Sequence, residues 1–195
     1  EKSAKKAIDG LEIGGRNLLL DSMNTIITGS DGGKDIIKIT NSRNLIKIEG
    51  VGEKKGTQNF WNTSFANKWS DKDGIFKDIQ KGVEFTLSMD VRYSGKHLVE
   101  LAFDTRSPDQ AYYAKTGAIK DTGGDWIRVY AVKKESGRSI NKTSLLIGWF
   151  YNIDVGDFVE IRNIKLEKGT KPTDWTPAPE DIENQISEVE TSIKK

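Results

Sequence analysis

One short stretch of the sequence combines aromatic side chains with amides and hydroxyls. Residues 60–69 read FWNTSFANKW. A sugar ring presents C–H groups to an aromatic face and hydroxyls to planar polar groups such as Asp, Asn and Arg. Because the aromatic residues follow no period of two, we expect a loop that exposes some of them. Trp61 and Trp69 are therefore candidate stacking platforms, and packing of both rings beneath the loop is the alternative.

A second group of candidates lies on the polar side of predicted strands. Over residues 83–93 the apolar side chains occupy the odd positions, which leaves Asp90 and Arg92 on the other side. Asp104 and Arg128 occupy the matching outward positions of later strands. Opposite charges on such a face can pair and still offer hydrogen bonds to a ligand. The alternative is a solvated face with weak surface ion pairs.

Further aromatic residues can border these surfaces. Tyr112 follows Pro108 in a turn-rich stretch, and Tyr151 shares one side of a strand with Trp149, as core or as groove lining. Trp126 opens a strand after a Gly-Gly turn, and we expect it in the core. The predicted sugar-contacting residues are Trp61, Trp69, Asp90, Arg92, Asp104, Arg128, Tyr112 and Tyr151.

The framework that positions these residues reads as strands. Alternation over 83–93 predicts a long half-buried strand, and alternation over 99–103 predicts a second. The short link of Ser94, Gly95 and Lys96 predicts a hairpin between them. Other apolar segments predict strands at 36–39, 45–48, 127–131, 145–151 and 158–166. Since turn-rich clusters separate these segments, the sequence predicts an all-β, antiparallel β-sandwich.

Both ends carry helical spacing. The apolar residues of the C-terminal segment recur at intervals of 4, 3 and 4, at Ile182, Ile186, Val189 and Ile193. This is a heptad seam, and its β-branched residues suit two or three helices. Ala4, Ile8 and Leu11 repeat the spacing more weakly. We therefore expect a coiled-coil-like helical linker at 1–13, a sandwich module at 14–177 and the start of a coiled-coil helix at 178–195.

Composition argues against several functions. The 30 basic and 29 acidic residues balance, so nucleic-acid binding is not expected. No apolar run is long enough for membrane insertion. The single His and the lack of catalytic motifs predict that the chain is not an enzyme. Glycan hydrolysis stays a weaker alternative, because it needs two carboxylates and adjacent predicted strands carry Asp90, Glu100 and Asp104.

Three stretches at the borders of the predicted sandwich carry a resemblance to a known family. They are GGRNLL (14–19), IRNIKLEKGT (161–170) and KPTDWTPAPED (171–181). Together they resemble the borders of modules in tail-fibre, baseplate and minor structural proteins of phages that infect Gram-positive bacteria, streptococci especially. Those modules are in turn similar to the jelly-roll carbohydrate-binding modules of glycoside hydrolases.

The resemblance implies a jelly roll whose two chain ends leave on one side. It also implies a place in the virion, in a phage tail or baseplate. Further implications are a homo-oligomer, as a trimer, joined by the flanking helices, and bacterial cell-surface polysaccharide as the ligand. A purely structural spacer of a tail fibre is the alternative function.

No cofactor is expected from the motifs, and a structural calcium ion is the alternative. The segments 31–33 and 71–74 contain Asp and Gly in turns, but neither completes a calcium-binding loop. Related jelly rolls often hold calcium near the paired terminal strands. Here Asn163 stands near the last predicted strand, where an acid would bind calcium more strongly.

Overall fold

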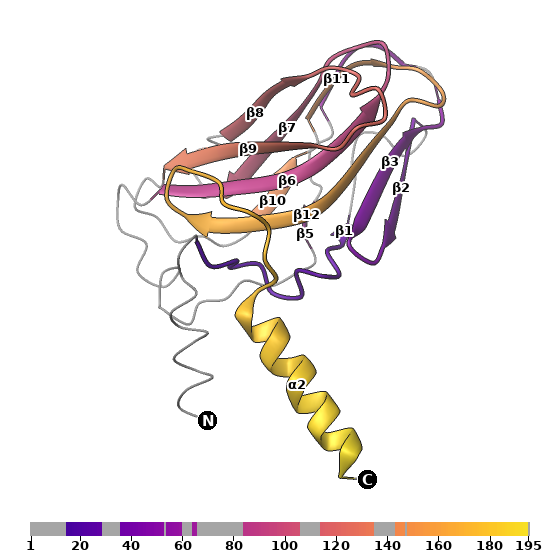
Figure 1. Ribbon diagram of the computed structural model, residues 1–195. Coiled ribbons are helices and arrows are strands. Elements are labelled where there is room, and N and C mark those ends of the chain that lie inside the picture. Colours follow the sequence, from indigo (N-terminus) through magenta and orange to yellow (C-terminus); the bar gives the residue numbers. More distant parts are fainter. Residues whose placement is uncertain are drawn as a thin grey trace.

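The chain folds as the alternating pattern predicts. The computed structural model describes residues 15–28, 36–52, 54–59, 64–65, 84–105, 114–134, 143–146 and 148–194. These residues form antiparallel sheets followed by one helix (Figure 1). The fold is therefore an all-β sandwich. The helix expected over residues 1–13 lies outside the described residues.

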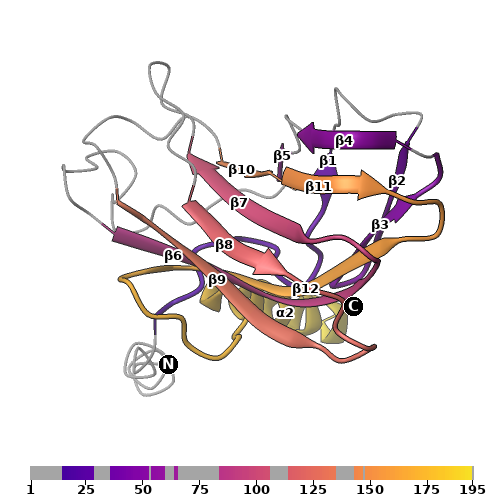
Figure 2. The same cartoon turned by 90° about the horizontal axis from the view of Figure 1, so that it is seen from above.

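The larger sheet is built from strands that come from both halves of the chain. In spatial order its five strands are β2 (Ile37–Ser42), β3 (Leu45–Gly50), β12 (Phe158–Lys168), β6 (Glu84–Ser94) and β9 (Ile127–Lys134). The smaller sheets are β10 (Thr143–Leu146), β7 (Val99–Thr105) and β8 (Ala114–Ile119); β11 (Gly148–Ile153) and β4 (Lys54–Asn59); and β1 (Ile27–Thr28) and β5 (Ser64–Phe65). Figure 2 shows β6, β9 and β12 on one side, with β7, β8, β10 and β11 opposite.

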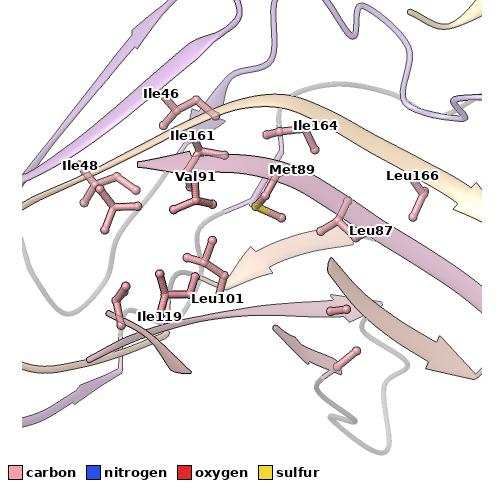
Figure 3. Close-up of a cluster of buried hydrophobic side chains, with 14 of the residues drawn as sticks. Ile46, Ile48, Leu87, Met89, Val91, Leu101, Ile119, Ile161, Ile164 and Leu166 are labelled. Atoms are coloured by element: carbon pink, nitrogen blue, oxygen red, sulfur yellow. The ribbon is translucent and has the colours of Figure 1, made fainter. Parts of the chain in front are cut away.

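The hydrophobic core lies between these layers. Strand β6 contributes the most to it, because its odd-numbered side chains from Phe85 to Tyr93 are almost completely buried. Leu101 of β7 and Ile119 of β8 meet them from the opposite layer (Figure 3). Full burial of each such side chain contributes about 1.5–3 kcal/mol. This packing fixes which side chains of β6 point outward.

The predicted hairpin between residues 83–93 and 99–103 is wrong. Strand β6 pairs with β12 and β9, whereas β7 pairs with β10 and β8. The connection crosses from one layer to the other because both strands bury apolar side chains in the same core. The buried Tyr93 hydroxyl donates to the carbonyl of His97 (2.7 Å), which helps to fix this crossing.

A β-bulge in β12 changes which of its side chains face the core. Val159 and Ile161 point inward before it, and Ile164 and Leu166 point inward after it. The extra residue is Asn163, whose φ of 52° lies in the left-handed region. Because of the bulge, one central strand changes its alternation in the middle of the sheet.

The chain that leaves β12 folds back over the outer side of the sheet. Lys165 is buried there, and its ammonium group donates to the Thr173 hydroxyl (2.8 Å) and the Asp174 carbonyl (2.8 Å). Glu167 accepts from the backbone N–H (3.1 Å) and the hydroxyl (2.7 Å) of Thr173. Burial lowers the pKa of the Lys165 ammonium group. Residues 169–178 therefore cover one end of this outer face.

The two borders of the sandwich lie side by side, as the resemblance implies. Residues 15–19 run along the end of β12, where the N–H of Leu18 donates to the carbonyl of Leu166 (2.8 Å). Helix α2 (Pro179–Ile193) starts beside this segment and points away from the sandwich (Figure 1). In the described residues, no helix is long and apolar enough to cross a bilayer.

Candidate functional site

The outward side chains of β6, β9 and β12 form one polar face. Antiparallel register brings Asp90 of β6 beside Arg128 of β9 on one side and Arg162 of β12 on the other. The next row along the strands pairs Arg92 of β6 with Glu160 of β12. Each of these residues neighbours an inward apolar residue, so the core packing described above sets its direction. We call this surface the polar face; it comprises Asp90, Arg92, Trp126, Arg128, Tyr130, Glu160, Arg162 and Asn163.

Asp90 and Arg128 form the centre of the polar face. Arg128 Nη1 donates to Asp90 Oδ1 (2.8 Å), and Arg128 Nη2 donates to the Ser88 hydroxyl (2.8 Å). Arg162 Nε lies 3.7 Å from the other Asp90 oxygen. The Asp90 and Arg128 side chains are only 18% and 26% exposed, so water screens this pair less than an open surface pair. The guanidinium and the carboxylate therefore hold each other in fixed orientations.

The bulge residue Asn163 completes this network. Its Nδ2 donates to Asp90 Oδ2 (2.7 Å), and its carbonyl accepts from Arg128 Nη1 (3.0 Å). Its Oδ1 accepts from Asn44 Nδ2 (2.7 Å), and its backbone N–H donates to Asn44 Oδ1 (3.1 Å). Asn44 also has a positive φ of 51°. Asn tolerates this conformation better than most residues. The strained backbone here directly orients the charged centre of the face.

Trp126 lies on the polar face, and its predicted place in the core is wrong. The ring is partly exposed, with the Arg162 guanidinium carbon 4.0 Å and the Arg92 guanidinium carbon 5.0 Å from its centroid. Arg92 in turn donates to Glu160 (Nε to Oε2, 2.7 Å). The Gly-Gly turn before β9 thus places the ring on the outer side of the sheet, where two cations stabilise its position.

A shallow depression continues the polar face at the edge of the sandwich. It has a volume of about 370 Å³ and lies between β8 and β9, lined by Lys115, Thr116 and residues 128–132. Tyr130 is 48% exposed here, so its ring and hydroxyl are accessible. Lys115 Nζ lies 3.4 Å from a carboxylate oxygen of Glu100. The depression therefore combines an accessible aromatic ring with hydrogen-bonding groups.

The structure brings together three of the predicted residues and separates two others from them. Asp90, Arg92 and Arg128 share the polar face, as predicted. Asp104 belongs to β7 in the opposite layer, where it pairs in register with Ser144. It cannot join Asp90, because the expected hairpin does not form. Tyr151 belongs to β11, whose partner is β4. Trp61, Trp69 and Tyr112 lie outside the described residues.

Besides Trp126, sequence reasoning missed the members of the polar face that β12 contributes. Glu160 and Arg162 alternate with Val159 and Ile161, so the rule applied to residues 83–93 would have found them. The sequence does indicate an irregularity at Asn163, because the apolar residues Ile161 and Ile164 are three positions apart instead of two. In the part of the chain that the structure describes, no group of three or more His, Asp or Glu side chains could hold a metal ion. The structural calcium stays a prediction.

Chemically, the polar face is suited to binding. It offers guanidinium donors, carboxylate acceptors and the exposed side chain of Tyr130, with the partly exposed ring of Trp126 beside them. Its two carboxylates, Asp90 and Glu160, both pair with arginine.

Comparison with solved structures identifies the same fold in a phage protein. The tripod BppUct-A-L from the baseplate of bacteriophage Tuc2009 is similar at a TM-score of 0.53 and 14% identity. The alignment covers 86% of this chain and 60% of that one, so this chain spans less than two thirds of its length.

Two weaker likenesses bear carbohydrate-binding names. One is BiXyn10A CBM1, at a TM-score of 0.49, 13% identity and coverage of 80% of this chain and 99% of that one. The other is the CBM22-1 xylan-binding domain of Paenibacillus barcinonensis Xyn10C, at a TM-score of 0.42 and 12% identity. That alignment covers 82% of this chain and 94% of the other. No family model matches the sequence, and a search of curated proteins finds no match. At these identities the comparisons show the fold alone: an antiparallel β-sandwich of the kind found in a phage baseplate protein.

Proposed function

We propose that this chain is a non-catalytic carbohydrate-binding module of a phage tail or baseplate protein, which attaches the virion to polysaccharide on the surface of a Gram-positive host. The observation that carries the proposal is the polar face, where Trp126 and Tyr130 stand among planar hydrogen-bonding groups whose orientations are fixed. The sandwich fold shared with a phage baseplate protein supports it.

Groups of the face that keep hydrogen-bonding or stacking capacity suit a sugar ring. The accessible ring of Tyr130 offers an apolar surface to C–H groups, and its hydroxyl can exchange hydrogen bonds with a sugar hydroxyl. The Arg162 side chain is 40% exposed and adds planar donors. Asp90 and Glu160 keep acceptor capacity, since an ionised carboxylate has about four lone-pair sites. Because Asp90, Glu160 and Arg162 are already held by partners within the face, binding to them would cost little side-chain entropy.

The charges of the face suit a polyol better than a polyanion. Three arginines, Arg92, Arg128 and Arg162, stand with two carboxylates, Asp90 and Glu160, so nearly every cation has an acidic partner. A ligand held by hydrogen bonds to such balanced pairs should bind with little dependence on salt.

The exposed stripe of α2 supports assembly into a trimer. Ile182, Ile186, Val189 and Ile193 are 40%, 50%, 57% and 78% exposed, although all are apolar and β-branched. Ile186 and Ile193 occupy the a positions of the heptad, and Ile182 and Val189 occupy the d positions. Isoleucine at both a positions and at one of the two d positions shifts the preference from two helices towards three or four, and the family resemblance implies three. Oligomerisation would then multiply a weak single-site affinity through effective concentration.

A structural spacer is the second candidate function, and one observation favours it. Arg128 donates three hydrogen bonds inside the protein, to Asp90, Ser88 and Asn163. A group engaged in this way can serve the stability of the sheet without any ligand. The predicted platforms Trp61 and Trp69 stay predictions.

Binding of the whole chain to purified host cell-wall polysaccharide tests the proposal. Tyr130→Ala and Arg162→Ala should each weaken binding, and Tyr130→Phe should separate the ring from the hydroxyl. Loss of a stacking ring should cost about 1–3 kcal/mol, by analogy with base stacking on aromatics.

Arg43→Ala is the matched control, because Arg43 is exposed in the turn between β2 and β3. No binding by the folded parent chain would support the spacer. Equal binding by the parent chain and all variants, with unchanged unfolding midpoints, would mean that the polysaccharide binds away from the polar face. Release of reducing sugar would instead indicate a hydrolase.

A further inference from the structure

The start of helix α2 is fixed to the N-terminal border of the sandwich. The Asp181 carboxylate accepts hydrogen bonds from the backbone N–H of Asp21 (2.7 Å), the backbone N–H of Ser22 (2.8 Å) and the Ser22 hydroxyl (2.6 Å). The Ser22 hydroxyl in turn accepts a hydrogen bond from the N–H of Ala178 (3.0 Å). Ala178 is buried and immediately precedes the helix. Hydrogen bonds to an ionised acceptor are about twice as strong as neutral ones. The first helical turn is therefore continuous with the sandwich.

Contacts on both sides of Asp181 extend this attachment. Arg16 and Glu180 form an ion pair whose side chains are mostly buried. One turn further along the helix, Gln185 Nε2 lies 3.5 Å from the sulfur of Met23. Asp181 and Gln185 are four residues apart, so they lie on the same flank of α2. The sandwich thus contacts the helix along this flank.

The apolar stripe of α2 points in a different direction. Its first residue, Ile182, follows Asp181 directly and is rotated by about 100° around the helix axis. On average the stripe lies about a quarter turn from the attached flank. All four stripe residues are exposed, so the sandwich leaves the stripe open.

We propose that the sandwich and α2 form one rigid body, with the sandwich fixed beside the apolar stripe so that further copies of this chain can pack on the stripe without displacing it. The occupant of the stripe, a second and third copy, rests on the proposed function. The rigid attachment of the sandwich to α2 is independent of the proposed function.

The charged positions of α2 indicate how the copies would be oriented. Glu183 and Glu190 occupy the e positions of the heptad, and Gln185 and Ser192 occupy the g positions. In an antiparallel pair the e positions face each other and glutamates would repel. In a parallel assembly e faces g of the neighbour, so glutamate meets an uncharged residue. The attached flank of α2 includes Gln185, which occupies a g position. Each sandwich would therefore lie beside the groove between its own helix and the next.

This arrangement has a consequence for recognition. Because each sandwich is held at one angle around the helix axis, the polar faces of the assembly would point in fixed directions. Effective concentration is highest when the spacing of sites on the ligand matches the spacing of the binders. A rigid assembly would therefore prefer polysaccharides, or polysaccharide densities, of one spacing.

Distance measurements between two spin labels within one chain test the rigid attachment. The chain contains no cysteine, so Lys120→Cys on the sandwich and Thr191→Cys on the helix create unique labelling sites. Diluting labelled chain with unlabelled chain keeps the measured distance intramolecular in any oligomer. The test variants are Asp181→Ala, Asp181→Asn and Ser22→Ala, and the control is Glu188→Ala, an exposed carboxylate of the same helix.

We expect one narrow distance distribution in the parent chain and in Glu188→Ala. It should at least double in width in Asp181→Ala and widen less in Asp181→Asn and Ser22→Ala, with the sandwich still folded by tryptophan fluorescence. If Asp181→Ala unfolds the sandwich, the two milder variants decide. A broad distribution in the parent chain, or unchanged widths in all folded variants, would overturn the proposal. Failure to bind polysaccharide would leave the distances unchanged and would count against the proposed function alone.

Discussion

Replacement of Asn17 by alanine should destabilise the protein more than any exposed Asn replacement. Asn17 is fully buried, and its side chain joins the two borders of the sandwich. Nδ2 donates to the carbonyls of Thr176 (3.0 Å) and Ile164 (3.3 Å). Oδ1 accepts from the N–H groups of Leu19 (3.1 Å) and Leu166 (3.2 Å). Alanine would leave all four backbone groups without this partner.

The size of the effect follows from the burial of those groups. An unsatisfied buried donor or acceptor costs about 1–3 kcal/mol. The two N–H groups belong to buried residues, whereas Thr176 is exposed and its carbonyl can bond to water instead. We therefore expect a loss of about 3–5 kcal/mol, a large part of the roughly 5–15 kcal/mol that stabilises a typical domain.

Urea unfolding followed by tryptophan fluorescence measures this loss, provided that the slope against urea stays constant. Asn184→Ala, on the exposed side of α2, is the control and should change stability by about 0.5 kcal/mol or less. Asn17→Asp should be at least as harmful as Asn17→Ala, because its carboxylate would face two carbonyl oxygens. A loss for Asn17→Ala as small as that of the control would refute the view that this side chain joins the borders.

Two further predictions concern the sheet that supports the polar face. Burial, with the negative charge of Asp157 second, raises the pKa of the Tyr93 hydroxyl to about 12. In the unfolded chain the pKa of this hydroxyl is near 10. The hydroxyl therefore contributes its full stabilisation below pH 10. About 2–3 kcal/mol of stability is lost as the pH rises from 10 to about 12. Urea midpoints across this range should therefore fall less steeply in Tyr93→Phe than in the parent chain, and equal slopes would contradict the assignment. Asn163→Ala should lose more stability than Asn163→Gly, because both lose the bond to Asp90 but only alanine is strained at φ 52°. The reverse order in calorimetry would show that the left-handed backbone of this bulge is not retained.

The period of two predicted strand β6 because burial on one side of the sheet makes apolar and polar side chains alternate. Alternation from Phe85 to Tyr93 placed Asp90 and Arg92 on the outer side, and the structure confirms it. Alternation alone does not say which strands pair. The link after Ser94 has the length of a hairpin, yet the chain crosses between layers, and Asp104 therefore lies in the other sheet.

Features that depend on distant segments were not predictable from local pattern. Lys165 and Glu167 are charged but buried, because residues 169–178 fold back over them. Trp126 reads as a core residue by type, but its ring lies against arginines that come from two other strands. The sequence next to Lys165, Glu167 or Trp126 does not show which distant residues will contact it, because these contacts form only when the sheet assembles.

Mapping the bound polysaccharide onto the protein tests the central proposal most directly. Titration of isotopically labelled protein with host cell-wall oligosaccharide, followed by NMR, should shift the backbone signals of Tyr130 and Arg162 and the indole N–H signal of Trp126. Signals from the exposed end of α2 should stay unchanged. Saturable shifts confined to residues away from β6, β9 and β12, or no shifts at millimolar oligosaccharide, would contradict the assignment of the polar face as the binding surface.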